Sequence, residues 1–405
     1  MRVKQLKMRS FRGIGDLTLD FDATEPTVLI GINGVGKSSV LDCLAILLSH
    51  LIQKYIGDWN NRTKRFFKAQ DIKNSISQDF KSEITILSES KELTWSVVGN
   101  GFSFSNNLEQ LDSLTDTKLP LVIYYPVNRA VLDIALELPQ NYIFDFIDML
   151  EQAVTEIKIN FNTFFQWFRS CEDLENEERR DDHEYRNLHL EAVRQAIYSL
   201  LPNFSNLRVR RSPLRMTVNK NGQELIVNQL SDGEKCLLAM VGDIARRLAI
   251  ANPSLPDPLQ GSGVVLIDEI ELHLHPKWQR EIIPALTRTF PNCQFIVTTH
   301  SPQVVSHVKP EGIYILEATD TGIIAKHPES SYGRDSNRIL EDLMGVPERP
   351  QEIKNRLRDL FRLIDEGNLD GARELQKDLV AEIGADEPDF ASAEVLIRRR
   401  EILGR

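Results

Sequence analysis

The sequence predicts an α/β fold with a mainly parallel sheet, and two observations carry the prediction. Residues 28–31 form an apolar run, residues 31–38 follow the pattern Gly-x-x-x-x-Gly-Lys-Ser, and residues 40–48 are apolar and helical in character. Further short apolar runs lie at 264–268, 294–299 and 313–317. Short apolar strands separated by helices pair in parallel and are covered on both faces by those helices.

The remaining elements follow from local patterns along the chain. Alternating polar and apolar residues within 3–31, at 83–88 and at 93–98 predict strands of an antiparallel β subdomain. The other predicted elements are a helix at 40–56, a strand at 119–127, a strand at 207–218, a helix at 236–250 and an amphipathic helix at 351–383 that is interrupted at 366–368.

A helical insertion is expected at 140–201. Four phenylalanines recur there at the spacing of one helix face, which predicts packing against a neighbouring element. They are Phe161, Phe164, Phe165 and Phe168. The densely charged residues 172–184 predict a solvated helix end and loop, and a binding role for them stays open.

The tail carries two short apolar helix faces on either side of a turn at Gly367-Asn368. The first comprises Leu357, Leu360, Phe361 and Ile364, and the second Leu369, Ala372, Leu375 and Leu379. Two arrangements stay open: the helices close on each other and on the rest of the chain, or they present an apolar groove to a partner.

Composition narrows the class of protein. The 405 residues have a net charge of −11, which gives no overall basic footprint for nucleic acid but leaves a local basic patch open. The four cysteines form no Cys-x-x-Cys pair, so neither a zinc site nor a disulfide framework is expected. No apolar run approaches the roughly 18 residues that span a bilayer, and the first residues are unlike a signal peptide. We therefore expect a soluble, cytoplasmic protein without a membrane segment.

The glycine-rich turn has the residues of a phosphate-binding loop. Its glycines let consecutive N–H groups turn toward a phosphate, Lys37 would reach the β- and γ-phosphates of a nucleoside triphosphate, and the Ser38 hydroxyl would hold Mg²⁺. The predicted nucleotide-binding residues are Asn33, Gly34, Val35, Gly36, Lys37, Ser38 and Ser39. The alternative is a turn of purely structural use, which the strand and helix on either side disfavour.

Polar residues follow two other buried strands. Asp268 and Glu269 come after the apolar run at 264–267, where Asp268 can orient Mg²⁺ and Glu269 can polarise the attacking water. His300 follows the strand at 294–299, where its imidazole can contact the γ-phosphate.

The segment Ser231-Asp232-Gly233-Glu234 precedes an apolar helix. A hydroxyl and free N–H groups at a helix N-terminus favour an anion, but Ser231 and Glu234 also have the spacing of an ordinary capping box. Both interpretations stay open, since one does not exclude the other.

Taken in order, these motifs resemble those of an ABC-type ATPase head. Asp268-Glu269-Ile270-Glu271-Leu272-His273-Leu274-His275-Pro276 and the opening Ser10-Phe11-Arg12-Gly13 are similar to the RecF/SMC/OLD branch rather than to transporters. The run 332–340 resembles the predicted ATP-binding "virulence" family of bacteria, which includes the ATPase subunits of Septu and retron-associated anti-phage systems. The resemblance covers about residues 1–345.

The resemblance implies a head-to-tail homodimer or higher homo-oligomer. Each nucleotide would lie between the phosphate loop of one subunit and the signature segment 231–234 of the other, which would act in trans. Gln70 would be the Q-loop glutamine near the metal, and Arg12 would lie on the adenine side of ATP. The resemblance further implies a separately encoded effector, most plausibly a nuclease, that the ATPase regulates.

Two other functions stay in competition. A RecF-like ATPase of DNA repair or recombination would bind DNA directly, with Arg208, Arg210, Arg211 and Arg215 as contacts, although a solvated strand face explains them equally well. A transporter subunit is disfavoured by the long loop at 251–263. The sequence lacks both the heptads of a long coiled-coil arm and the acidic cluster of a TOPRIM nuclease.

Four segments are therefore expected. They are 1–139, the first part of the ATPase head; 140–201, the helical insertion; 202–345, the second part of the head; and 346–405, a helical tail suited to docking a partner.

Overall fold

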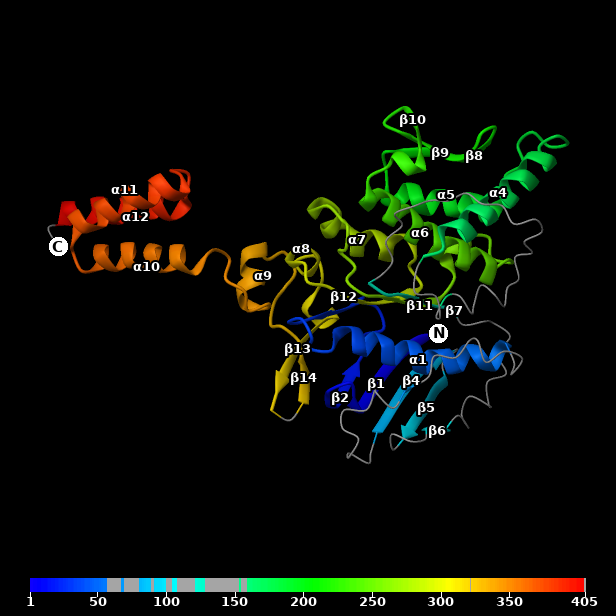
Figure 1. The fold of residues 1–405 in the computed structure, drawn as a ribbon, viewed down its shortest axis with the longest axis horizontal. Coiled ribbons are helices and arrows are strands. Elements are labelled where there is room, and N and C mark those ends of the chain that lie inside the picture. Colours follow the sequence, from blue (N-terminus) through cyan, green and yellow to red (C-terminus); the bar gives the residue numbers. More distant parts are fainter. Residues whose placement is uncertain are drawn as a thin grey trace. The chain divides into compact units, whose positions relative to one another are not determined.

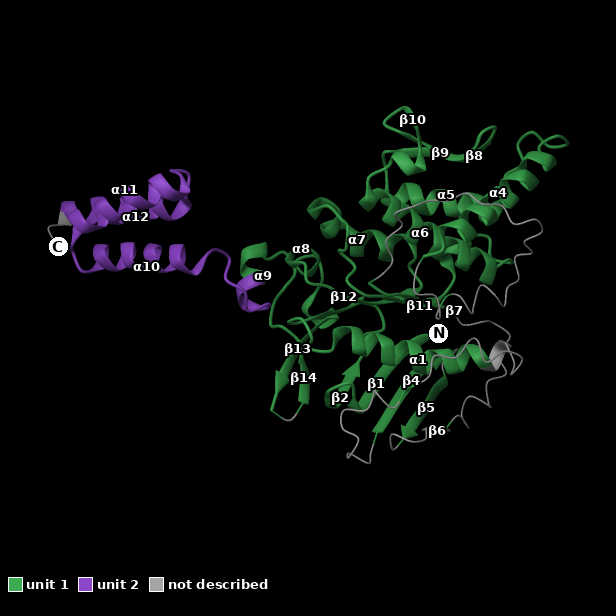
Figure 2. Ribbon diagram, in the orientation of Figure 1, with its two compact units in different colours: residues 1–339 green, residues 340–405 purple. Residues whose placement is uncertain are grey.

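The computed structural model describes residues 1–56, 67–68, 80–88, 91–99, 104–107, 121–127, 153, 159–320 and 322–403. The chain forms two compact units, residues 1–339 and residues 340–405 (Figure 2). The boundary between them falls close to position 346, where the helical tail is expected to begin.

A six-stranded sheet forms the centre of the first unit (Figure 1). Its strands are, in spatial order, β14 (Gly322–Lys326), β13 (Ile313–Thr319), β3 (Thr27–Ile30), β12 (Cys293–Thr298), β11 (Gly263–Ile267) and β7 (Leu121–Tyr125). Strands β13 to β7 pair in parallel, and β14 pairs antiparallel at the edge. Every residue of β3, β12, β11 and β7 is buried, as expected for strands covered on both faces. The predicted α/β fold with a mainly parallel sheet is confirmed.

A second, antiparallel sheet lies on the other side of helix α1 (Lys37–Ile56) from the parallel sheet (Figure 1). Its strands are, in spatial order, β2 (Ile14–Asp20), β1 (Arg2–Phe11), β4 (Phe80–Ser88), β5 (Lys91–Gly99) and β6 (Phe104–Asn107). The Trp95 indole in β5 donates to the Leu47 backbone oxygen in α1 at 3.0 Å. Helix α1 is thus enclosed between two sheets, which explains why it is apolar around most of its circumference.

Helices α4 (Phe161–Glu178), α5 (Leu188–Leu200) and α6 (Asp232–Ala251) lie on the opposite face of the parallel sheet from α1 (Figure 1). The predicted aromatic face of α4 is buried there. A Cβ atom at Gly242 of α6 would lie 2.8 Å from the Phe164 ring, so the missing side chain lets the two helices approach closely. Helix α7 (Pro276–Thr289) connects β11 to β12.

The strand expected at 207–218 is a hairpin rather than one strand. It consists of β8 (Phe204–Arg211) and β9 (Leu214–Lys220), and β10 (Gln223–Ile226) completes a three-stranded antiparallel sheet. The break falls at Ser212-Pro213, because proline cannot donate to a strand ladder and favours a turn.

The expectation of a solvated connector at 172–184 is wrong in its first part. Helix α4 continues to Glu178, and Glu172 and Glu175 are buried. Glu175 pairs with Arg194 of α5 at 3.0 Å, and Glu172 pairs with Arg211 of β8 at 2.9 Å. The cations that make this burial possible come from elements distant in sequence, so the local charge pattern does not reveal it.

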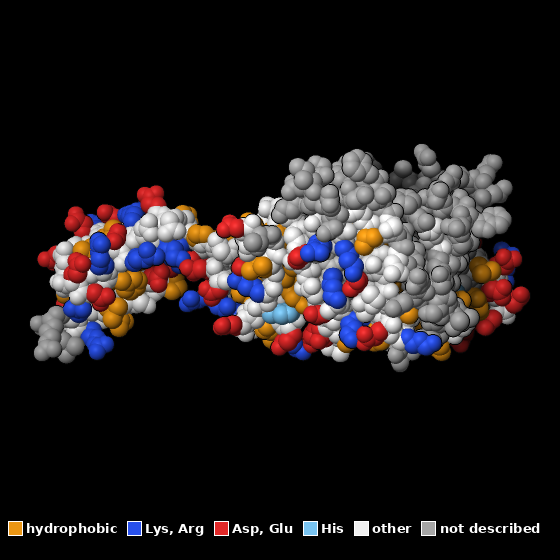
Figure 3. Space-filling model, turned by 90° about the horizontal axis from the view of Figure 1, so that it is seen from below, with side chains coloured by type: hydrophobic (Ala, Val, Ile, Leu, Met, Phe, Trp, Pro, Cys, Tyr) orange, Lys and Arg blue, Asp and Glu red, His pale blue; other side chains and the backbone are white. Residues whose placement is uncertain are grey.

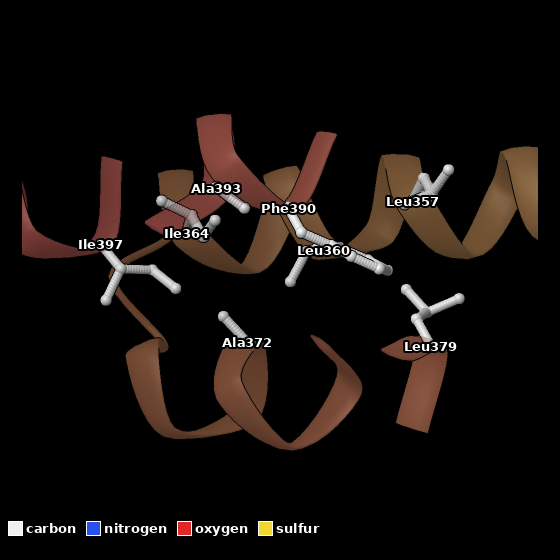
Figure 4. Packing of buried hydrophobic residues seen from close by; sticks show 8 residues of the cluster. All are labelled: Leu357, Leu360, Ile364, Ala372, Leu379, Phe390, Ala393 and Ile397. Atoms are coloured by element: carbon white, nitrogen blue, oxygen red, sulfur yellow. The ribbon is translucent and has the colours of Figure 1, made fainter. Parts of the chain in front are cut away.

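In the described part of the second unit, a bundle is formed by α10 (Gln351–Asp365), α11 (Leu369–Ile383) and α12 (Pro388–Leu403). The predicted break between the first two helices is confirmed. Their apolar faces meet those of α12 in one core (Figure 4), which contains Leu357, Leu360, Ile364, Ala372, Leu379, Phe390, Ala393 and Ile397. Helix α12 therefore covers much of the apolar surface of α10 and α11 that could otherwise form a groove for a partner.

The remaining described helices are short. They are α8 (Pro302–Val305), α9 (Ser336–Asp342) and the 3₁₀ turns η2 (Val227–Gln229), η3 (Pro258–Gln260) and η4 (Pro310–Gly312). Among the described residues, none of the helices has both the length and the hydropathy that crossing a bilayer requires.

Candidate active site

Three neighbouring strands bring the predicted site residues to one edge of the parallel sheet. Strand β12 lies between β3 and β11, and Val297 of β12 is in register with both Val28 and Ile267. Because the three strands are parallel, their carboxyl ends meet at the same edge, where ligands of open α/β sheets bind. The phosphate loop, Asp268-Glu269 and His300 all follow directly from these ends.

The loop after β3 lies close against β13. A side chain at Gly31 would place its Cβ atom 2.5 Å from the Leu316 backbone oxygen, and Gly31 has φ of +146°. Only glycine satisfies both conditions. Asn33, Gly34 and Ser38 are exposed, and these positions are free to meet a phosphate.

The other predicted loop residues differ in their exposure. Gly36 and Ser39 are half-buried. The Val35 side chain is buried, so this residue anchors the loop and offers a ligand its backbone alone.

Lys37 is the first residue of α1, and its side chain is held inside the loop. Its ammonium group donates to the backbone oxygens of Gly31 at 2.8 Å and Ile32 at 3.0 Å. Burial lowers the pKa of Lys37, while the nearby carboxylates of Asp268, Glu269 and Glu271 act in the opposite direction. The lysine thus lies at the same strand ends as the acids after β11.

Thr298 connects the two acids that follow β11. Its hydroxyl donates to Asp268 Oδ1 at 2.5 Å and accepts from the Glu269 backbone N–H at 2.7 Å. Asp268 is buried, whereas Glu269 is half-buried and has φ of +48°. Thr298 was not predicted as a site residue, although a polar side chain at the end of an apolar strand is a usable signal.

Glu271 performs a similar role for the segment after β12. Its carboxylate accepts from the Thr299 hydroxyl at 2.7 Å and from the His300 backbone N–H at 2.6 Å. The His300 side chain remains exposed. Glu271 was likewise missed as a site residue, and its spacing of two from Glu269 is the signal that the sequence offers.

The signature segment begins helix α6, and the capping-box interpretation is confirmed. Ser231 is the N-cap, its hydroxyl accepts from Glu234 N–H at 3.4 Å, and Glu234 Oε2 accepts from the Ser231 N–H at 3.1 Å. Ser231 and Asp232 are exposed, whereas Gly233 is buried. A Cβ atom at Gly233 would lie 2.5 Å from the His273 backbone oxygen, so the segment packs against the loop that follows the two acids in its own chain.

Glu234 is an ionised residue within this turn. Lys220 of β9 contacts Glu234 Oε1 at 2.7 Å. Burial raises the pKa of Glu234, but hydrogen bonds from Lys220 and Ser231 outweigh this effect and hold it below the ordinary value.

Arg12 lies beside the phosphate-loop helix. Its guanidinium pairs with Asp42 of α1 and lies 5.0 Å from the centre of the Phe11 ring. Asp42 also accepts from the Tyr124 hydroxyl at 2.9 Å. The structure thus brings Arg12 to α1, while Gln70 lies outside the described residues.

The residues present fit a magnesium ion. Ser38 offers an exposed hydroxyl at the start of α1, and Asp268 offers a carboxylate at the end of β11. These hard oxygen donors are of the kind that Mg²⁺ uses when it is bound mainly through phosphates and one or two side chains. When bound, the ion would neutralise charge on the phosphates.

This combination of fold and strand-end residues defines a P-loop ATPase with an SMC head-like fold. A solved structure with this fold is described as the SMC head bound to the C-winged helix domain of ScpA. It matches with a TM-score of 0.50 and 14% identity over 81% of this chain and 98% of that one.

Residues 27–306 match the family described as "AAA domain, putative AbiEii toxin, Type IV TA system", and the chain belongs to this family. The retron Ec83 probable ATPase of Escherichia coli is 30% identical over 99% of this chain and 87% of its own length. The retron Vc95 probable ATPase of Vibrio cholerae is 30% identical over 91% and 85%. The Septu protein PtuA of Bacillus thuringiensis is 23% identical over 85% of each chain. The resemblance to retron ATPases and to the Septu protein PtuA is confirmed.

Proposed function

We propose that this protein is the ATPase subunit of a bacterial anti-phage defence system. In the cytoplasm it forms a homodimer and slowly hydrolyses ATP at the interface between the two subunits. This hydrolysis regulates a separately encoded effector, which is a nuclease. The observation that carries the proposal is the convergence of the phosphate loop, Asp268-Glu269 and His300 at one sheet edge, together with relatives named as retron ATPases.

In this mechanism each residue has one task. Lys37 and the loop N–H groups bind the phosphates, and Ser38 and Asp268 hold Mg²⁺. Glu269 accepts a proton from the attacking water. His300 contacts the γ-phosphate from the neighbouring strand end, with its backbone held by Glu271.

The proposal that the site forms between two subunits rests on the exposed N-terminus of α6. Ser231 and Asp232 face outward at a helix N-terminus, which favours an anion from another molecule. Ser231 would therefore contact the triphosphate that is bound by the partner subunit.

Complementation between two inactive variants tests this arrangement. Lys37→Ala removes the phosphate-binding cation, and Ser231→Arg blocks the exposed signature face. A bulky residue at Gly233 is unsuitable, because it would collide with His273 of its own chain. Each variant alone should lack ATPase activity, and the mixture should regain about a quarter of wild-type activity, since one composite site of each mixed dimer is intact. The absence of recovery, with subunit exchange demonstrated, would mean that the site lies within one chain.

The competing DNA-binding function is less well supported, because three of the four arginines that suggested it have acidic partners. Arg208 and Arg210 do share a face of β8, but both pair with Glu224 of β10, at 3.2 and 2.8 Å. Arg211 pairs with Glu172 and Asp173. On the face shown in Figure 3, basic side chains of both units are also interspersed with acidic ones. Salt-dependent binding of the isolated chain to duplex DNA would restore this function.

A further inference from the structure

The signature turn carries a carboxylate where a triphosphate is to be bound. The Ser231 hydroxyl donates to Glu234 Oε2 at 2.9 Å, and the Ser231 N–H points to the same oxygen at 3.1 Å. The two groups that would meet the partner's phosphate are therefore in direct contact with a negative charge. An anion approaching them is repelled unless that charge is balanced.

Lys220 supplies the balancing charge from a different element. It is the last residue of β9, and it reaches the other oxygen of Glu234, Oε1, at 2.7 Å. The Glu234 side chain is only 6% exposed, whereas that of Lys220 is 33% exposed. Solvent therefore screens the glutamate poorly, and the lysine contributes most of the compensation.

The second acid of this turn differs in its surroundings. Asp232 pairs with Lys235 at 2.8 Å, but its side chain is 61% exposed. Water and salt can screen this carboxylate without any protein partner. Of the two acids, Glu234 is thus the one whose effect on an incoming phosphate depends on a specific lysine.

The ion pair also lies beside a pocket. Lys220 and Glu234 both line a pocket of about 310 Å³, together with Trp278 of α7. The Trp278 ring lies 3.2 Å from the position of a Cβ atom at Gly233. The pocket, the ion pair and the signature turn are therefore contiguous.

We propose that Lys220 is a positioning residue for the signature segment. By neutralising Glu234, it allows the Ser231 hydroxyl and N–H to donate hydrogen bonds to the partner's triphosphate, so that the β9–β10 hairpin controls closure of the composite site. This inference rests on the proposed function, because it requires the signature segment to act in trans.

The test compares Lys220→Ala, Glu234→Gln and the double variant, all in the Glu269→Gln background that prevents turnover. The Lys220→Ala monomer, at protein concentrations too low for dimerisation, should bind ATP with unchanged affinity, because Lys220 contacts the signature turn rather than the phosphate loop. It should weaken ATP-dependent dimerisation about tenfold or more in analytical ultracentrifugation. The double variant should restore dimerisation, since a glutamine keeps the capping hydrogen bonds without the charge, and Lys220→Arg should retain it.

Arg210→Ala is the matched control, because it removes a cation from the same sheet that pairs with Glu224 instead. Its dimerisation should equal that of the parent, and thermal melting should show that all variants are folded. Normal dimerisation of Lys220→Ala, or a double variant as weak as the single one, would overturn the inference. If the parent itself fails to dimerise with ATP, the proposed trans site is wrong and this inference falls with it.

Discussion

At the scale of single residues, the Lys37 ammonium is already placed for phosphate binding. It is buried and donates to two loop oxygens, so little side-chain entropy remains to be lost when ATP binds. Lys37→Ala should therefore reduce ATP affinity about 100-fold, the effect of removing a charge-assisted contact worth ~3 kcal/mol. Calorimetric titration with ATP measures this directly. Wild-type affinity in the variant would remove Lys37 from the site.

Glu269→Gln tests the catalytic base separately from binding. A glutamine keeps the size of the side chain but accepts no proton, so turnover should fall about 10²–10⁴-fold while ATP affinity stays unchanged. Single-turnover hydrolysis and equilibrium binding distinguish the two effects. Undiminished turnover would mean that another group activates the water.

Thr298 provides a prediction that the sequence did not. Thr298→Val keeps the shape of the side chain but removes one hydrogen bond from Asp268 and one from the Glu269 N–H. We expect a loss of stability of about 1–3 kcal/mol and a decrease in turnover of about tenfold or more. Thr298→Ser keeps the hydroxyl and should restore turnover. Wild-type turnover of Thr298→Val would show that the hydroxyl does not position the two acids.

The sequence predicts which residues lie at the ends of strands better than it predicts the hydrogen bonds between those residues. Asp268 and the loop that carries Lys37 directly follow buried strands, and His300 comes just after a third, so the parallel sheet alone brings them to one edge. Thr298 and Glu271 act through hydrogen bonds to residues 30 and 28 positions away. Such bonds depend on which strands are neighbours, and no local pattern contains that information.

At the scale of elements, a buried charged cluster joins the signature helix to the sheet. Asp243 of α6 accepts from Arg246 at 2.7 Å, from Arg247 at 2.8 Å and from the Tyr125 hydroxyl of β7 at 2.8 Å. The Tyr125 backbone oxygen in turn accepts from the Asp268 N–H at 2.9 Å. One tyrosine therefore contacts both the signature helix and the acid that holds the metal in our proposal.

Asp243→Asn should destabilise the protein by about 3–5 kcal/mol at neutral pH, because it removes the buried carboxylate charge that pairs with Arg246 and Arg247. Burial raises the pKa of Asp243, but Arg247 and Arg246 hold it at about 2. Its pKa in the unfolded chain is about 3.9. The contribution of the Asp243 charge to the free energy of unfolding is therefore complete above about pH 5. It is lost as the pH falls from about 4 through about 2.

Urea unfolding across this range measures the difference between the wild type and Asp243→Asn. The difference in the free energy of unfolding between the two proteins should decrease as the pH falls, because residue 243 then carries no charge in either protein. A constant difference down to pH 2 would show that the carboxylate charge is not what stabilises the cluster.

Charge patterns were the least reliable guide to elements. Glu172 and Glu175 belong to a run that looks solvated, yet Arg194 and Arg211 reach them from α5 and β8. The apolar faces of α10 and α11 were recognised correctly, because hydrophobic periodicity within a helix is a local property. Whether α12 or a partner covers such a face is again a matter of tertiary contact.

At the scale of the whole molecule, the second unit has a core of its own. Ending the chain after Pro350 removes α10, α11 and α12 together, so no half of this core is left exposed. We expect the shortened protein to hydrolyse ATP normally and to lose co-purification with the effector, for which this unit is the proposed docking surface.

Point variants of the full chain locate that surface more finely. Val395 and Ile402 of α12 are 66% and 84% exposed, so a partner could contact these apolar side chains directly. Val395→Glu with Ile402→Glu should abolish effector capture without changing the melting temperature, whereas Ile324→Glu on β14, also an exposed apolar residue, should not. Continued capture by the shortened chain would move the docking surface to the first unit. Metal-dependent DNA cleavage by the pure protein, lost on mutation of one of its own acids, would remove the need for a separate nuclease.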